Sequence, residues 1–142
     1  MRIIIDTCVA LDYMQNRGGF ESDASHVIAL CCMRVVDGFF TSKSFADLYY
    51  LMHHFLHSDE ETRIAIAKWR TAIGILDIKG DDCLAALASP ISDYEDAIMS
   101  EVAKREDVDY IVTRNCSDYR KSEIPAVTPS EFISLLMRSV KS

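Results

Sequence analysis

Aspartates stand at the ends of several elements that the sequence predicts, and carboxylates placed in this way can hold a metal ion. Asp6 directly follows Ile3-Ile4-Ile5, a β-branched run that is too short for a helix and is typical of a buried strand. In an open parallel sheet, ligands bind at the carboxyl ends of the strands. Asp6 also precedes a helical pattern from Thr7 onward and can cap that helix. Both interpretations of Asp6 stay open at this point.

Further acids occupy comparable positions downstream. Asp47 lies in the first turns of a predicted helix that follows a strand, Asp93 and Asp96 lie at the start of another, and Asp118 follows the strand predicted at 109–113. Each acid alone also fits a helix N-terminus, where the helix dipole stabilises it by about 0.3–1 kcal/mol. Gathered at one edge they would repel one another by about 4 kcal/mol per pair at 4 Å and an effective dielectric near 20. Such a cluster therefore predicts bound cations.

Oxygen ligands of this kind select Mg²⁺ or Mn²⁺. A divalent ion at the cluster could polarise a phosphate oxygen and supply hydroxide for in-line attack on a phosphodiester. The acids therefore indicate nuclease chemistry.

The elements that must position these acids alternate along the chain. Strands are predicted at 3–5, 39–41, 75–78, 109–113 and 124–127, and helices at 7–16, 22–36, from 42 or 44 to 55, 59–73, 81–88, from 92 or 93 to 103, and from 128 onward. Arg17-Gly18-Gly19 ends the first helix, Asp37-Gly38 the second and Gly74 the fourth, whereas Thr128-Pro129-Ser130-Glu131 is a strong helix start. This order predicts an α/β fold with a central, mostly parallel sheet and helices on both faces.

Composition limits the classes of function. The 142 residues, 49% hydrophobic and 26% charged, are expected to form a single domain over 1–142. We find no apolar run of membrane-spanning length and no signal peptide, so we expect no membrane association and a cytoplasmic location. A net charge of −7 disfavours nucleic-acid binding unless cations or a basic patch assist. The five cysteines contain no Cys-x-x-Cys pair and indicate neither disulfides nor a zinc site.

The motifs around the acids carry a family resemblance. The opening Ile-Ile-Ile-Asp-Thr-Cys-Val-Ala-Leu-Asp resembles the start of PIN domains, and Asp-Tyr-Glu-Asp-Ala-Ile at 93–98, followed by Asp-Tyr-Ile-Val-Thr-Arg-Asn at 109–115, resembles their C-terminal signature. The segment 124–132 is also similar to the close of the family. The resemblance implies a three-layer α/β/α sandwich and a Mg²⁺- or Mn²⁺-dependent ribonuclease. Many prokaryotic single-domain members are toxins of the VapC type, paired with an antitoxin.

When the functional residues of the family are assigned to the matching positions of this sequence, the resemblance implies that Asp6 and Asp96 are the principal metal-binding acids. Asp47 matches a second acidic position, where many members have Glu. Asn115 stands where many members carry an acid; it cannot supply charge but can hold a water molecule or a phosphate through hydrogen bonds. Asp118, three residues further on, can restore the missing charge. We therefore predict Asp6, Asp47, Asp96 and Asp118 as metal ligands, with Asn115 as a further catalytic residue.

Partners and rival functions follow from the same residues. We expect an RNA substrate, drawn by the metal and by local basic residues such as Arg114, which can contact phosphate or pair with a carboxylate. An antitoxin partner is implied by the family only. A homodimer is expected because the apolar helix faces at 45–55 and 64–73 exceed what one small sheet covers. The main alternative is a non-catalytic PIN-like protein-binding module with a weakened metal site; a phosphoacceptor receiver-like domain ranks lower, because its characteristic acid pair and lysine are not evident.

Overall fold

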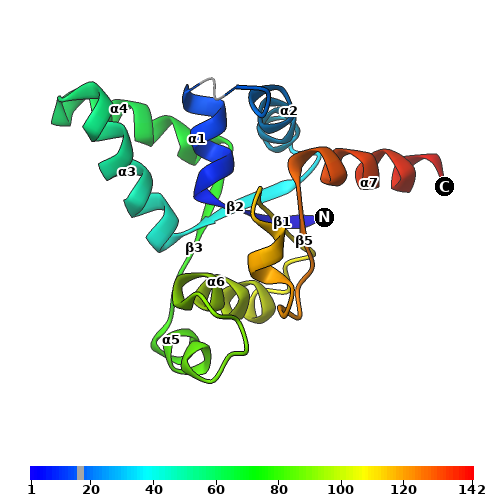
Figure 1. The fold of residues 1–142 in the computed structure, drawn as a ribbon. Coiled ribbons are helices and arrows are strands. Elements are labelled where there is room, and N and C mark those ends of the chain that lie inside the picture. The colour runs from blue at the N-terminus through cyan, green and yellow to red at the C-terminus, as the bar shows by residue number, and fades with distance from the viewer. Residues whose placement is uncertain (16–17) are drawn as a thin grey trace.

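A five-stranded sheet forms the centre of the molecule in a computed structural model that describes residues 1–15 and 18–142 (Figure 1). Its strands run β3-β2-β1-β4-β5 across the sheet, and every strand pair is parallel. Their bounds are Arg2–Ile5 for β1, Asp37–Thr41 for β2, Gly74–Leu76 for β3, Tyr110–Val112 for β4 and Ala126–Val127 for β5. The predicted parallel sheet is confirmed.

The first strand lies in the middle of the sheet, and its β-branched residues are buried on both faces. Ile3, Ile4 and Ile5 are all fully buried, and β1 pairs with β2 on one side and β4 on the other. The amide of Asp6 extends this pairing by donating to the carbonyl of Val112 at 3.0 Å. Asp6 therefore leaves the sheet at its carboxyl edge, beside the end of β4.

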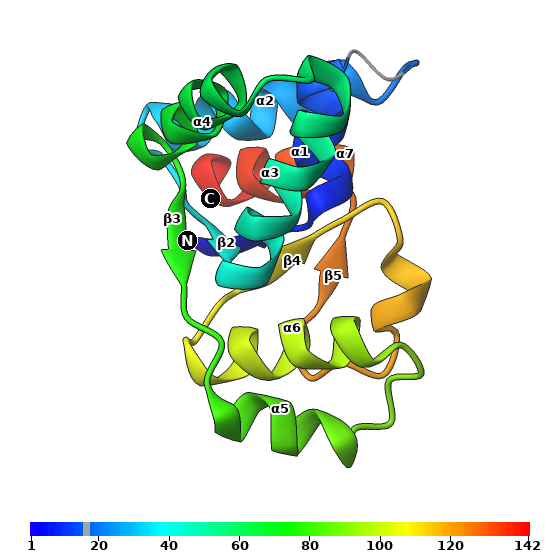
Figure 2. The ribbon, with the colours of Figure 1, turned by 90° about the vertical axis from the view of Figure 1, so that its left-hand side faces the viewer.

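Helices cover both faces of the sheet, as Figure 2 shows from the side. One face packs on α1 (Thr7–Gln15), α2 (Glu21–Cys32), α3 (Ser42–Leu56), α4 (Asp59–Ala67) and α7 (Pro129–Lys141), and the other on α5 (Gly80–Leu87) and α6 (Tyr94–Arg105). Ile3 and Ile5 belong to the first apolar cluster and Ile4 to the second, as alternation along a strand requires. The chain therefore has the predicted three-layer α/β/α architecture.

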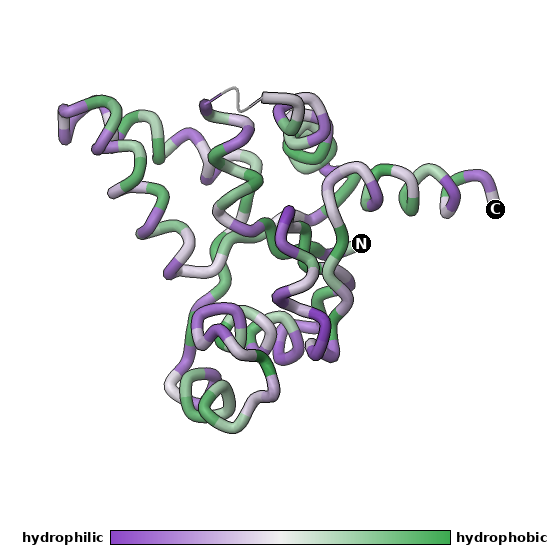
Figure 3. The backbone as a smooth tube through the Cα atoms, in the orientation of Figure 1, coloured by the Kyte–Doolittle hydropathy of each residue, from purple (hydrophilic) through white to green (hydrophobic). Residues whose placement is uncertain are grey.

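Apolar residues predominate along the central strands, whereas apolar and polar residues alternate along the helices (Figure 3). No helix among the described residues is both long and apolar enough to cross a membrane.

Two predicted helices end earlier than the sequence pattern indicates. The helix predicted to Val36 ends at Cys32, because Arg34 adopts a left-handed backbone conformation with φ of 59°, and Asp37-Gly38 begins β2 instead of ending the helix. The helix predicted at 59–73 ends at Ala67 and continues as a 3₁₀ turn over Lys68–Thr71. The predicted end of the first helix, at residues 16 and 17, lies outside the described residues.

Side-chain caps begin the helices that carry the acids. The hydroxyl of Thr41 accepts the Ser44 amide at the start of α3, and the Asp93 carboxylate accepts the Asp96 amide at the start of α6. A capping box between Thr128 and Glu131 starts α7, as predicted. Asp96 lies in the first turn of α6 and Asp47 in the second turn of α3, and both line a hollow that Asp6 shares at the exit of β1.

Candidate active site

Three of the predicted acids line one small hollow at the carboxyl edge of the sheet. Asp6 follows β1, Asp47 lies in α3 and Asp96 lies in α6, and the hollow that they share has a volume of about 60 Å³. We call it the acid pocket. This convergence of three elements follows from the parallel topology, which brings strand ends and the following helix starts to one edge.

Asp6 is held by two hydrogen bonds. Its Oδ1 accepts the amide of Thr7 at 2.8 Å, and its Oδ2 accepts the hydroxyl of Thr113 at 2.8 Å. Both bonds favour the charged carboxylate, but burial raises the pKa of Asp6 above its ordinary range, and the nearby charge of Asp118 adds to the rise. Asp6 thus contacts the first amide of α1 and also faces the acid pocket, so the two interpretations of its role are compatible.

Asp96 carries the most strongly shifted carboxyl group of the pocket. Burial and the charges of Asp93, Asp6 and Asp118 raise its pKa from 3.8 to about 6, although the Tyr119 hydroxyl opposes this by donating to Oδ1 at 2.8 Å. The negative charges of three neighbouring acids therefore act on Asp96 in addition to its burial. This accumulation of negative charge favours the binding of a cation.

The third acid already has a cationic partner. The ammonium group of Lys43 lies 2.6 Å from Oδ2 of Asp47 and 3.3 Å from Oε2 of Glu95, and all three residues line the acid pocket. Sequence reasoning did not single out Lys43 or Glu95 as site residues. The only signal for them is their positions in the first turns of α3 and α6, on the helices that also carry Asp47 and Asp96.

The two remaining predicted residues line other hollows. The Asn115 side chain is exposed and borders a hollow near the start of α7, and Asp118 borders another with Asp93 and Lys121. Asp118 still acts on the acid pocket at a distance, because its charge raises the pKa of both Asp6 and Asp96. The structure therefore brings Asp6, Asp47 and Asp96 together and leaves Asn115 and Asp118 at the periphery.

Arg114 pairs with a carboxylate that the sequence analysis did not single out. Its Nε lies 2.7 Å from Oδ2 of Asp12, a fully buried residue of α1. Arg114 was expected either to contact phosphate or to pair with a carboxylate, and in the structure it pairs with a carboxylate. Asp12 stands four residues after Cys8 in the opening motif, but its partner lies 102 positions away, so no local pattern indicates the pair.

The acid pocket offers the oxygen ligands that a hard divalent cation prefers. Its carboxylates and the neighbouring hydroxyls offer only oxygen ligands, and burial, together with neighbouring acids, raises the pKa of both Asp6 and Asp96. Among the residues at 1–15 and 18–142, however, no three His, Cys, Asp or Glu side chains stand close enough to form a ready-made metal cluster. Asp6 and Asp96 therefore fit an ion best, and Asp47 reaches one only by releasing Lys43.

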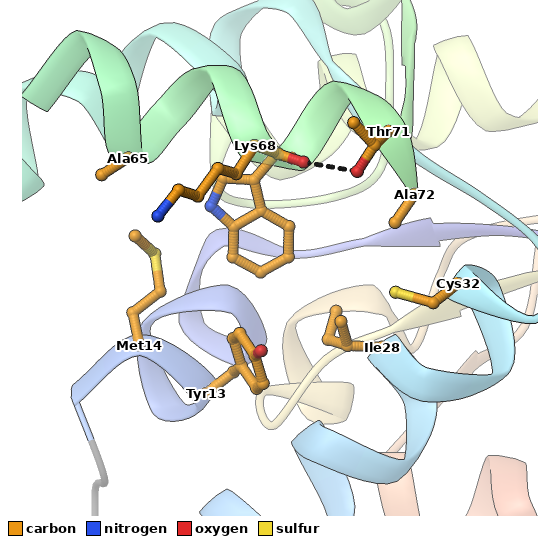
Figure 4. Close-up of a pocket in the computed structure, with 9 residues that line it drawn as sticks. Tyr13, Met14, Ile28, Cys32, Ala65, Lys68, Thr71 and Ala72 are labelled. Carbon is orange, nitrogen blue, oxygen red and sulfur yellow. Dashed lines mark hydrogen bonds between the residues drawn. The ribbon is translucent and has the colours of Figure 1, made fainter.

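A separate apolar hollow lies between α1, α2 and the end of α4 (Figure 4). Tyr13 and Met14 of α1 face Lys68, Thr71 and Ala72 across it. The described residues that line it are mostly apolar and include no Asp or Glu. The acid pocket is the better candidate for chemistry.

Comparison with known families identifies the class of protein. Residues 2–117 match the family model of the PIN domain, which is most of the chain. The protein belongs to the PIN domain family. No curated protein matches it in sequence.

Solved structures have the same fold at low identity. VapBC2 from Rickettsia felis, bound to a DNA fragment from its promoter, aligns with a TM-score of 0.68 at 13% identity, covering 90% of this chain and 98% of that chain. A toxin–antitoxin complex from Klebsiella pneumoniae aligns at 0.65 and 20% identity, covering 89% and 97%. VapC20 from Mycobacterium tuberculosis, a toxin that cleaves the sarcin–ricin loop, aligns at 0.59 and 13% identity, covering 77% and 86%.

Proposed function

We propose that the protein is a Mg²⁺- or Mn²⁺-dependent endoribonuclease that hydrolyses RNA phosphodiesters. The observation that carries this proposal is the convergence of Asp6, Asp47 and Asp96 on one pocket, with the pKa of Asp96 raised to about 6 by burial and by neighbouring acids. Carboxylates in that state are stabilised by a cation, and PIN domains are a nuclease family. We further propose that residues 1–142 act as one such domain.

In this proposal Asp6 and Asp96 hold the ion, with Asp47 and Asp118 as additional acids. A bound divalent ion would neutralise charge on the scissile phosphate and lower the pKa of the attacking water. The hydroxyl of Thr113 keeps Oδ2 of Asp6 in one orientation, and the hydroxyl of Tyr119 does the same for Oδ1 of Asp96. These two hydrogen bonds preorganise the carboxylates before substrate arrives.

We also propose that the protein is the toxin of a toxin–antitoxin pair and acts in the cytoplasm. Its fold is similar to a toxin–antitoxin complex and to a toxin that cleaves the sarcin–ricin loop. An antitoxin segment that carries arginine or lysine would complement the acid pocket, and co-purification with the product of the neighbouring gene tests this.

A homodimer is part of the proposal. Tyr50 and Phe55 on α3 and Ile64 on α4 remain more than half exposed, as the apolar patterns of these segments predict. Light scattering measures the oligomeric state: a mass of two chains supports the dimer, and a mass of one chain contradicts it.

Cleavage of a labelled RNA with and without Mn²⁺ tests the activity. We expect Mn²⁺-dependent fragments from the natural protein and at least about a hundredfold loss with Asp6→Asn, because removing one preorganised charge at such a site costs several kcal/mol. Asp59→Asn, on the exposed start of α4, is the matched control and should keep full activity. Metal-independent cleavage, or equal rates for Asp6→Asn and the natural protein, would contradict the proposal.

One observation favours the alternative of a non-catalytic PIN-like protein-binding module. Lys43 already pairs with Asp47 and Glu95 and offsets one of their two negative charges, so part of the charge that would attract a metal is balanced within the chain. Calorimetry separates the two functions: Mn²⁺ binding that Asp6→Asn abolishes supports the enzyme, and absence of Mn²⁺ binding supports the module.

A further inference from the structure

A second hollow near the acid pocket has the features of a binding site for a nucleobase. We call it the Phe20 pocket; it is lined by Phe20 and Asp23 at the start of α2, Arg114 and Asn115 after β4, and Ser130 in the first turn of α7. Its volume of about 280 Å³ lies near the lower end of the roughly 300–1,000 Å³ typical of small-molecule sites. It is much larger than the acid pocket of about 60 Å³. One planar base is a suitable occupant in size.

Arg114 is a fixed wall of this pocket and not a free cation. Its Nε lies 2.7 Å from the buried Asp12, and moving it away would leave a buried carboxylate without its countercharge. Its guanidinium carbon lies 4.5 Å from the centroid of the Phe20 ring. The ring is therefore held by a cation–π contact, while 50% of Phe20 remains exposed and available for stacking.

The charges of the pocket favour a neutral base over a phosphate. Asp12 offsets the positive charge of Arg114, and Asp23 adds a carboxylate to the lining, so the three side chains carry a net negative charge. A phosphate would be repelled. A carboxylate accepts hydrogen bonds, and the exocyclic amino groups of adenine, cytosine and guanine can donate them, whereas uracil has no amino group.

Asn115 supplies the complementary recognition group and a physical link to the acid pocket. Its exposed amide has both a donor and an acceptor, which reading a base edge requires. Its backbone amide donates to the Thr113 hydroxyl at 3.0 Å, and that hydroxyl donates to Oδ2 of Asp6 at 2.8 Å. Two consecutive hydrogen bonds thus connect the lining of the Phe20 pocket to the candidate catalytic acid.

We propose that the Phe20 pocket binds one RNA base with an exocyclic amino group, next to the phosphodiester that the acid pocket addresses. This inference rests on the proposed ribonuclease function and names the substrate feature that it selects. Phe20 provides the stacking surface, Asp23 accepts the amino group, and Asn115 contacts the rest of the base edge. In this proposal Asn115 determines base specificity and does not bind the metal. This role explains why an amide stands at a position where many family members have an acid.

Binding of uncleavable 2′-O-methyl tetranucleotides to the full chain tests the proposal, with fluorescence anisotropy as the readout at low salt. The natural protein should bind oligo-C or oligo-A at least about fivefold more tightly than oligo-U. Phe20→Ala should weaken the tighter complex by about fivefold or more, as loss of one stacked base does. Leu87→Ala is the matched control, because Leu87 is also an exposed apolar residue but lies at the end of α5, on the opposite face of the sheet from α2, and its affinities should equal those of the natural protein.

A second variant keeps the test informative if Phe20→Ala is poorly folded. Asp23→Asn should reduce the preference for amino-bearing bases over uracil, because an amide offers a weaker acceptor than a carboxylate. Equal affinities for oligo-U and the other tetranucleotides would overturn the proposal. Equal losses with Phe20→Ala and Leu87→Ala would also overturn it. Because the assay involves no cleavage, base-selective binding by a protein without RNase activity would refute only the proposed function.

Discussion

The Tyr119 hydroxyl donates a hydrogen bond of 2.8 Å to Oδ1 of Asp96, so the segment after β4 holds a carboxylate at the start of α6. Tyr119 is buried, and the bond favours the charged form of Asp96. It acts against burial and neighbouring acids, which raise the pKa of the same group. This tyrosine is therefore a positioning residue for one of the two acids expected to hold metal.

Removing the Tyr119 hydroxyl should raise the pKa of Asp96 further. In the metal-free Tyr119→Phe variant, the opposing hydrogen bond is lost while burial and the nearby acids remain, so the pKa should rise above about 6. Carbon-13 NMR of the carboxyl groups measures the titration. Tyr13→Phe, which lies in the apolar hollow of Figure 4, is the control and should leave the Asp96 titration unchanged. A lower pKa in Tyr119→Phe would contradict the assignment.

Asp96 should make the metal-free protein less stable as the pH rises. Its pKa is raised from 3.8 to about 6 in the folded chain, so its stabilising contribution is complete below pH 3.8 and is lost as the pH rises through 6. Asp96→Asn should therefore exceed the natural protein in free energy of unfolding at pH 7.5, by about 1 kcal/mol once solvent screening of a half-buried group is allowed for.

Urea unfolding in EDTA at pH 4 and pH 7.5 measures this difference, with Asp59→Asn as a control for removing one surface carboxylate. An Asp96→Asn advantage of the same size at both pH values would show that the carboxyl group is not the cause.

Lys43 should compete with a divalent cation for Asp47. In Lys43→Met the ammonium group is removed from its positions 2.6 Å from Asp47 and 3.3 Å from Glu95, so both acids become available and the pocket gains one negative charge. We expect Mn²⁺ to bind several-fold more tightly, with roughly 1 kcal/mol or more of additional Coulomb attraction. Isothermal titration calorimetry measures the affinity. Lys68→Met is the matched control, and weaker Mn²⁺ binding by Lys43→Met would assign Lys43 a supporting role instead.

The buried pair of Asp12 and Arg114 should contribute strongly to folding. Asp12→Asn leaves the guanidinium without its countercharge, and we expect a loss of about 2 kcal/mol, below the roughly 3–5 kcal/mol of fully buried pairs because Arg114 is partly exposed. Chemical denaturation measures it. The exposed pair of Asp59 and Arg63 is the control, where Asp59→Asn should cost less than about 0.5 kcal/mol. Equal costs at the two pairs would contradict this account.

The parts of the structure that could be predicted are those with local causes. A run of three isoleucines indicates a buried strand whatever surrounds it, and Thr-Pro-Ser-Glu at 128–131 contains every group of the capping box that starts α7. Parallel topology then brings strand ends and helix starts to one edge. For this reason Asp6, Asp47 and Asp96 could be placed together before any coordinates were known.

The parts that could not be predicted depend on side-chain direction in irregular segments and on distant partners. Asn115 and Asp118 lie in the turn after β4, whose backbone directs one toward α7 and the other toward Asp93. The contact between Lys43 and Glu95 joins two helices that are 52 positions apart. Helix periodicity also overestimated α2, because it does not detect the left-handed residue at Arg34.

The most direct test of the account is a crystal structure of the natural protein soaked in Mn²⁺, with data collected to record the anomalous scattering of manganese. The account predicts an anomalous peak in the acid pocket, coordinated by carboxylate oxygens of Asp6 and Asp96, and no such peak in crystals of Asp6→Asn. Absence of a peak between these two carboxylates in the natural protein, with manganese bound elsewhere or not at all, would contradict it.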